Sequence, residues 1–286
     1  TERRRGQMAS STETTQYSSG EITTVARGGM GYYSRAAGKT NSGYMEGQLG
    51  GYSESVTSNQ APDAVTQNQR SNITYGGSPA NPLSTGYYEV SKQGFKQEDG
   101  TMGYGPETRT LRRGIGYDDE GRMTGYAETR MSKGQTSTEN FSVKEFDEFG
   151  RSKATTSERV EAGVRTVENR TDITYLGGSQ LGSYRAEIVS AGNMSTVEFA
   201  AKAYDSVGRM TAFTQTETSA GIAVVTERIS TVFNRWGLPA RYIEDAMSGG
   251  ITTRTMRSIE YNSSGLASAY KEYIADKGTY LDPTGA

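Results

Sequence analysis

The chain has 286 residues, of which 33% are apolar, and its mean hydropathy is −0.70, so it is poorly supplied for the thick core of a three-layer enzyme fold. Nineteen tyrosines, seven phenylalanines and a net charge of only −2 exclude the low-hydrophobicity, high-charge signature of a disordered chain. The sequence contains no His and no Cys, which excludes Ser-His-Asp and Cys-His catalysis, disulfides and thiolate metal sites.

Residues 1–32 are predicted to be a partial repeat cut out of a longer array. The stretch GQMASSTETT at 6–15 resembles GRMTGYAETR at 121–130, so Thr1 falls near a turn inside a repeat. The Gly-rich RGGMGY at 27–32 is more typical of a turn than of a phosphate loop, because no Lys-Ser/Thr follows it. Three arginines at 3–5 indicate a solvated end. No nucleic-acid partner is expected for a chain with a pI near 5.5.

Residues 33–116 are predicted to form two long repeats with loop insertions. Tyr33, Tyr75 and Tyr117 are equally spaced, and GYME at 43, GYYE at 86 and GYAE at 125 mark the same strand in three units. The stretches SNQAPDAVTQNQ at 58–69 and GGSPANPLSTG at 76–86 have loop composition. Insertions on one rim of a repeat array are often functional, so the loops at 43–69 and 76–105 are candidates for partner contacts, and loop drift without function is the alternative.

Residues 117–279 are predicted to form six hairpin repeats, the last one incomplete, followed by a tail at 280–286. The repeats are marked by aromatic anchors at a nearly constant spacing, shorter than that of the preceding units: Tyr117, Phe146, Tyr175, Tyr204, Phe233 and Tyr261. Soon after most anchors stands a glycine, namely Gly121, Gly150, Gly208, Gly237 and Gly265. A second glycine follows every anchor at a fixed interval, as in Gly134 and Gly163, so each unit has two turn signals and two stretches between them.

The stretches between the turn signals have strand chemistry. They are rich in Thr, Val, Tyr and Phe and alternate approximately, without a helical period. Asp-x-x-Gly and its Asn variants predict a type I turn closed by a glycine with positive φ, and Lys-Gly, Ala-Gly and Gly-Gly predict the opposite turn. The sequence therefore predicts an all-β fold of tandem hairpins, with a period of about 29 residues, in one continuous antiparallel sheet.

The motif Tyr-Asp-x-x-Gly-Arg-Met-Thr, present as YDDEGRMT at 117–124 and YDSVGRMT at 204–211, resembles the YD repeats of the RHS-repeat family. That resemblance implies a β-sheet curled into a hollow spiral, tube or barrel-like shell, in secreted or surface proteins of bacteria, some of which enclose a toxin. The chain departs from the family in two ways. Its period is longer than the usual one, and it has no evident toxin domain or self-cleaving segment.

No catalytic residue, cofactor or metal site is expected. Acidic residues such as Asp118, Asp147 and Glu148 are spread over repeat tips, where they indicate turns rather than a paired-carboxylate glycosidase. No run approaches the roughly 20 apolar residues of a membrane helix. Trp236, in the turn NRWG, and Tyr242 are the candidate contacts for a glycan or a protein partner, and stacking inside the sheet is the alternative for such aromatics.

The resulting hypothesis is a non-catalytic structural segment that builds an extracellular wall, tube or filament. Its expected partners are copies of itself or adjoining repeats, with glycans as a further class. One alternative is an adhesin or glycan-binding module that uses the long loops, and a second is a shell that encloses a toxin.

Overall fold

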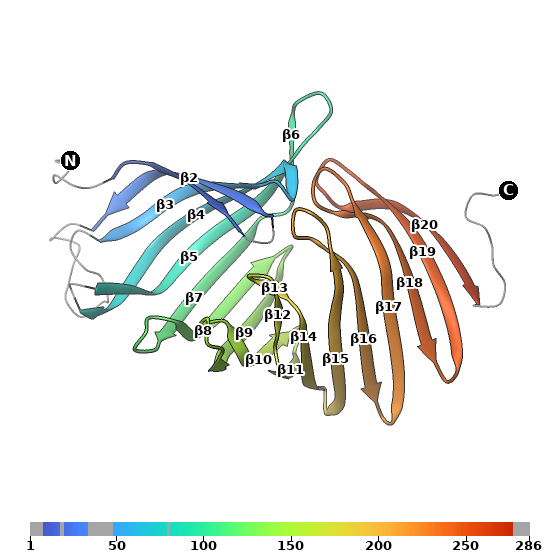
Figure 1. Ribbon diagram of the computed structural model, residues 1–286. Helices are drawn as coiled ribbons and strands as arrows, with labels where there is room; N and C mark the ends of the chain where they lie inside the picture. The colour runs from blue at the N-terminus through green and yellow to red at the C-terminus, as the bar shows by residue number, and fades with distance from the viewer. Residues whose placement is uncertain (1–7, 18–19, 34–47, 79–80, 277–286) are drawn as a thin grey trace.

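The computed structural model describes residues 8–17, 20–33, 48–78 and 81–276 (Figure 1). Within these residues the protein is all-β and contains no helix. An 18-stranded antiparallel sheet makes up almost the whole fold, and the two short strands β12 and β13 form a separate pair. The predicted all-β class and the continuous antiparallel sheet are confirmed.

The strands of the large sheet are β1 (Ser11–Gln16), β2 (Ile22–Tyr32), β3 (Leu49–Ser58), β4 (Ala61–Ser78), β5 (Asn81–Lys96), β6 (Met102–Tyr104), β7 (Thr108–Tyr117), β8 (Met123–Ser132), β9 (Gln135–Phe146), β10 (Ser152–Glu161), β11 (Val164–Thr171), β14 (Ser183–Ser190), β15 (Asn193–Tyr204), β16 (Met210–Ser219), β17 (Ile222–Phe233), β18 (Pro239–Ser248), β19 (Ile251–Tyr261) and β20 (Ala267–Asp276). The separate pair is β12 (Tyr175–Leu176) and β13 (Gln180–Leu181). Each long strand pairs antiparallel with the next one along the chain, so the sheet is an up-and-down meander, and β6 is a short extra strand on β5.

Two-residue turns join the strands along one rim, which we call the XG rim. They are Lys133-Gly134, Ala162-Gly163, Ala191-Gly192, Ala220-Gly221 and Gly249-Gly250. Both residues of each turn have positive φ, as a type I′ turn requires. That geometry matches the right-handed twist of the flanking strands, so it explains why a glycine always occupies the second position.

Four-residue turns form the opposite rim, which we call the DxxG rim. They are Asp118–Gly121, Asp147–Gly150, Asp205–Gly208, Asn234–Gly237 and Asn262–Gly265. In each turn the glycine has positive φ and its N–H donates to the carbonyl of the first residue, at 2.9–3.0 Å. The aromatic anchor immediately before each of these turns is the last residue of its strand.

Register shifts recur in the strands that lead into the DxxG rim. They lie between Arg113 and Tyr117 in β7, between Ala201 and Tyr204 in β15, and between Glu260 and Tyr261 in β19. An extra residue on one strand bends the sheet and increases its local twist. Repetition of this bulge along one rim is consistent with the curvature of the whole sheet in Figure 1.

The stretches predicted to be loops in the N-terminal part are mostly strands. Residues 61–69 belong to β4 and residues 81–86 to β5, and these strands have 18 and 16 residues. The loop prediction for 58–69 and 76–86 was wrong because the Asn, Gln and Pro residues suggested turns. Pro62 and Pro82 each occupy the second position of a strand, close to its end, where proline is tolerated. The candidate contact loop at 43–47 lies outside the described residues.

The sheet is open at both ends of its strand order. Within the described parts of the chain, β1 pairs only with β2, and β20 pairs only with β19. The expectation of a closed, barrel-like shell is therefore not met. Instead the sheet bends so that β2–β5 and β15–β20 form two arms, whose ends approach each other beside β6 (Figure 1).

Apolar packing is concentrated where the two arms meet. Ala64, Phe95 and Trp236 form a buried cluster, and Ala61, Leu238 and Tyr261 pack partly against it. No large side chain among the described residues falls below 2% exposure. A sheet with so little apolar burial depends on its backbone ladder and on side-chain pairs between strands.

Candidate functional site

The DxxG turns hold an arginine against an aromatic ring. Asp118 accepts hydrogen bonds from the Arg122 backbone N–H at 2.8 Å and from its side-chain Nε at 2.6 Å. The guanidinium carbon of Arg122 lies 4.4 Å from the ring centre of Phe146, the anchor of the next unit. This geometry explains the spacing Asp-x-x-Gly-Arg: the aspartate closes the turn and aims the arginine at the neighbouring anchor.

We call this arrangement of aspartate, arginine and aromatic ring the DxxG clamp. It recurs at Asp147–Arg151 and at Asp205–Arg209. Partial desolvation opposes ionisation of these three aspartates. Hydrogen bonds from the arginine side chain and backbone outweigh it, so the pKa of each carboxyl lies below its usual value. In the turns that begin with Asn234 and Asn262, the amide oxygen accepts the backbone bonds, and a leucine replaces the arginine.

The anchor tyrosines tie each repeat to the previous one through their hydroxyl groups. Tyr204 donates to the carbonyl of Leu181 at 2.7 Å, and Tyr261 donates to that of Pro239 at 2.8 Å. The same bond is made by Tyr75, Tyr117 and Tyr175. Burial raises the pKa of these phenols, so they remain protonated donors.

A ladder of aromatic rings and arginines crosses one face of the sheet, and we call it the ring ladder. Its rings are Tyr52, Tyr87, Tyr126, Tyr184, Phe213, Tyr242 and Tyr270, contributed by β3, β5, β8, β14, β16, β18 and β20. Arginines on the intervening strands lie over them. For example, the guanidinium carbon of Arg228 is 3.9 Å from the ring centre of Tyr242. Two intervening strands supply phenylalanine instead, and Phe141 and Phe199 stack on Tyr126 and Tyr184 at 5.2 and 5.1 Å.

Glutamates complete the ring ladder by accepting bonds from the same arginines. Arg112 donates to Glu128 at 2.9 Å and Arg228 donates to Glu244 at 2.9 Å, while Arg257 pairs with Glu272. The side chain of Glu128 is only 3% exposed, so this carboxylate is buried within the ladder. Glu128 pairs with Arg112 and Arg130, and a buried carboxylate without such partners would be strongly destabilising. The ladder therefore favours the strand register that keeps these pairs together.

Contacts between the two arms form what we call the rim seam. The XG rim of the N-terminal arm meets the DxxG rim of the C-terminal arm. Arg209 donates to the carbonyl of Gln60 at 2.7 Å, and the Gln60 amide donates to that of Val207 at 2.9 Å. Further along, the Asp63 N–H donates to the Arg235 carbonyl at 3.2 Å, and Gln97 donates to the Ser263 carbonyl at 3.3 Å.

Trp236 lies in the middle of the rim seam. It is 9% exposed, its ring packs at 61° and 5.5 Å against Phe95, and its indole N–H donates to the Lys96 carbonyl at 3.0 Å. A ring held in this way has little free face for stacking on a sugar. Tyr242 lies elsewhere, in the ring ladder between Arg228 and Arg257, so the two predicted contact residues are not brought together.

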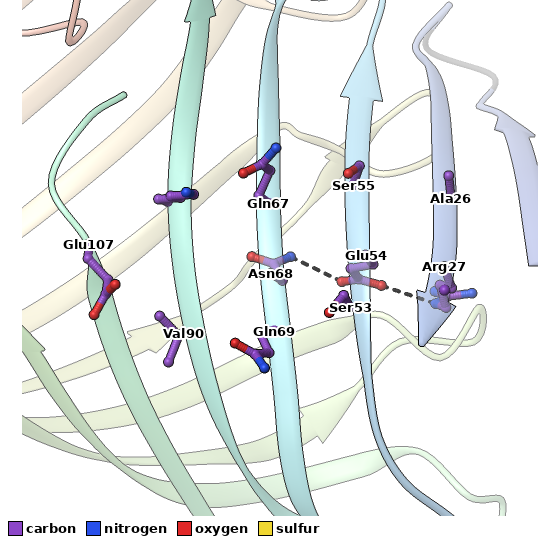
Figure 2. Close-up of a pocket in the computed structure, with 12 residues that line it drawn as sticks. Ala26, Arg27, Ser53, Glu54, Ser55, Gln67, Asn68, Gln69, Val90 and Glu107 are labelled. Carbon is purple, nitrogen blue, oxygen red and sulfur yellow. Dashed lines mark hydrogen bonds and ion pairs between the residues drawn. The ribbon is translucent and has the colours of Figure 1, made fainter. Parts of the chain in front are cut away.

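A polar trough lies across β2, β3, β4 and β5 and has a volume of 590 Å³ (Figure 2). Arg27, Glu54 and Asn68 form a row across three strands. Arg27 Nε and the Asn68 amide each donate to the Glu54 carboxylate at 3.0 Å. Gln67, Gln69 and two serines flank this row. The trough could not be predicted from the sequence, because its members come from four strands whose register only the fold supplies.

The described ranges contain no cluster of three or more acidic side chains that could hold a metal ion. Within the same residues, no helix has the length and apolar character needed to cross a membrane. The chemistry of the described surface is thus dominated by paired arginines and carboxylates, tyrosine rings and backbone groups.

Comparison with known proteins gives no further assignment. A scan against protein-family models and a search of curated proteins found no match to this chain. The resemblance to YD repeats consequently rests on the sequence motif and remains a prediction.

Proposed function

We propose that the chain is a non-catalytic structural repeat segment of a secreted or cell-surface bacterial protein. Its tandem hairpins build a wall that winds as a spiral, and the partners are adjoining repeats or further copies of the chain. The observation that carries this proposal is the rim seam, in which opposite rims of one sheet meet.

The order of contacts along the rim seam supports the spiral. The β1–β2 turn approaches the β15–β16 turn, because a Cβ on Gly20 would overlap the carbonyl of Ser206. The β3–β4 turn contacts the β15–β16 and β17–β18 turns through Gln60 and Asp63. The end of β5 and the following β6 turn reach the β17–β18 and β19–β20 turns. Contacts advance in the same direction on both rims, as is expected for a strip wound over itself.

The ring ladder supports a mechanical rather than a chemical role. Its arginines, carboxylates and rings are engaged with one another across many strands. Cross-strand pairs of this kind contribute about 0.2–1 kcal/mol each, and their number grows with each repeat. Stability added repeat by repeat is the property that a wall or filament requires.

Small-angle X-ray scattering and electron microscopy of the purified chain test the proposal. A curved particle whose scattering matches the seamed arms is expected, together with tubes, shells or fibres at high concentration. An extended flat ribbon would contradict the spiral, and compact monomers at every concentration would contradict assembly. Phe149→Ala, on a DxxG turn outside the rim seam, is the control for Trp236→Ala, which is expected to open the arms.

Glycan binding is the second candidate, and the polar trough favours it. Amide and carboxylate side chains in a row offer the hydrogen bonds that sugar hydroxyls need, and Arg27 and Tyr52 lie at the same end. A glycan array tests this candidate. Binding lost in Asn68→Ala and retained in Trp236→Ala would place the glycan in the trough. Loss in Trp236→Ala alone would place it at the rim seam.

A further inference from the structure

β20 is the last strand of the large sheet among the described residues, and its outer edge pairs with no described strand. Three of its large side chains are more than half exposed: Tyr270 at 64%, Tyr273 at 60% and Ile274 at 62%. Exposed edges that carry large apolar side chains are templates for pairing with another strand. The residues of β20 therefore form a docking surface whose chemistry can be read from the rest of the sheet.

The inner rings of the ladder are contacted from both neighbouring strands. Their partners are Arg27 and Arg70 for Tyr52, Arg70 and Arg112 for Tyr87, Arg112 and Phe141 for Tyr126, Arg170 and Phe199 for Tyr184, Phe199 and Arg228 for Phe213, and Arg228 and Arg257 for Tyr242. On the side that follows in the chain, the partner is arginine for four rings and phenylalanine for two.

Tyr270 is the ring that lacks this second partner among the described residues. Arg257 on β19 lies 5.2 Å from its ring centre, and no described strand lies on the other side of β20. Glu272, two residues further on, pairs with the same Arg257. The outermost rung of the ladder thus has an aromatic ring and a carboxylate beside an unpaired backbone edge.

We propose that the outer edge of β20 binds an extended strand that carries an arginine facing Tyr270, with phenylalanine as the second choice. This inference deepens the proposed function, since it states the chemistry by which one repeat segment accepts the next. Backbone hydrogen bonds supply the pairing, and the cation over the ring sets the register. A strand with an acidic residue at that position is rejected, because it would lie beside Glu272.

The pairing of β18 with β19 supplies the register. There Tyr242 faces Arg257, and Asp245 faces Arg254. Tyr270 and Tyr273 occupy the equivalent positions on β20, one repeat later in the chain. A strand with the sequence of β19 would therefore place one arginine beside Tyr270 on one face of the sheet and a second beside Tyr273 on the opposite face, because residues three apart on a strand point to opposite sides.

A synthetic peptide with the sequence of residues 251–261 tests the inference. Fluorescence anisotropy measures its binding to the whole chain, and hydrogen exchange locates the amides that it protects. Binding is expected, with new protection in β20. The Arg257→Glu peptide is expected to bind at least 10-fold more weakly, the Arg257→Ala peptide about 3- to 10-fold more weakly, and the Arg257→Phe peptide between the wild-type and the Ala peptide.

Variants of the protein complete the test. Tyr270→Ala is expected to weaken binding of the wild-type peptide. It is also expected to remove most of the difference in affinity between the wild-type and the Arg257→Ala peptides. Tyr17→Ala, next to the opposite edge strand, is the matched control and should leave binding unchanged. Equal binding of all peptides, no binding, or protection confined to β1 would overturn the inference.

Two further results separate this inference from the proposed wall. If Tyr270→Ala leaves self-association of the protein unchanged, the inference about the β20 edge is wrong. That result would not contradict the proposal based on the rim seam. Peptide binding that persists in Trp236→Ala would show that the edge works when the arms are open, so a failure of the spiral would leave the edge inference standing.

Discussion

The two arms of the sheet reach the rim seam with different local structures. In the C-terminal arm, regular DxxG turns project from strands of 10 to 12 residues. In the N-terminal arm, β4 and β5 have 18 and 16 residues, and their ends carry the irregular segments that meet those turns. The same type of turn therefore only connects two strands at 147–150, whereas at 234–237 it also packs against the other arm. What differs is the surface opposite it.

Trp236 and Phe149 give the sharpest test of this difference, since both occupy the third position of a DxxG turn. Phe149 is 72% exposed, whereas Trp236 is 9% exposed and packs on Phe95. We expect Trp236→Ala to lower the free energy of unfolding by about 3 kcal/mol and Phe149→Ala by less than about 1 kcal/mol. Urea denaturation followed by circular dichroism measures both. Equal decreases in the free energy of unfolding would contradict the proposed difference between the turn in the rim seam and the turn outside it.

Gly103 tests how closely the arms approach each other. A Cβ at this position would overlap the carbonyl oxygen of Ser263, whereas a Cβ on Gly28 would meet nothing within 4 Å. We expect Gly103→Ala to destabilise the protein by about 2 kcal/mol, because the seam must shift to make room. Gly28→Ala should change stability by less than about 0.5 kcal/mol. A neutral Gly103→Ala would mean that the arms are not in contact at β6.

Acid should weaken the DxxG clamps while leaving the two Asn turns unchanged. The carboxyls of Asp118, Asp147 and Asp205 have a lowered pKa when folded, so the unfolded chain binds protons first as pH falls. Their contribution is complete above the unfolded pKa of about 3.9 and is lost as pH drops through the lower folded pKa. Replacing all three by Asn should flatten the fall in stability between about pH 5 and pH 2. An unchanged slope would assign acid sensitivity to other carboxylates.

Ala162 offers the smallest and most local test, on the rim opposite the clamps. It has a φ of 47° in a two-residue turn, a conformation that Asn adopts more readily than Ala. We expect Ala162→Asn to stabilise the protein by about 0.5 kcal/mol and Ala162→Val to destabilise it, since a β-branched residue is disfavoured there. Thermal melts of both variants check the sign. Changes in the same direction would argue against the type I′ assignment.

Local features of the sheet were predictable from the sequence, because each is encoded within a few residues. Glycines after Lys133, Ala162 and Ala191 mark turns through their backbone freedom, and the anchors mark the ends of strands. The strand character of 61–69 was missed, since Asn and Gln suggest loops although they also pair well across a polar sheet.

The rim seam was not predictable from local patterns. Trp236 is buried by Phe95 and Lys96, about 140 residues earlier in the chain, and no sequence spacing connects them. Its position in a turn suggested an exposed contact residue, because the surface that covers it belongs to the other arm. Only part of the ring ladder could be predicted from the sequence. The aromatic positions repeat in the sequence, but their arginine partners are identified only by the register between strands.

The type I′ hairpins have a consequence for how the molecule assembles in time. Two-residue turns allow a hairpin to form within microseconds, because its two strands are close together in the chain. The bond from Arg209 to Gln60 spans 149 positions, so it forms only after both arms exist. We therefore expect the hairpins to form first and the rim seam to form last. Formation of the rim seam is the slow phase that we expect in refolding kinetics.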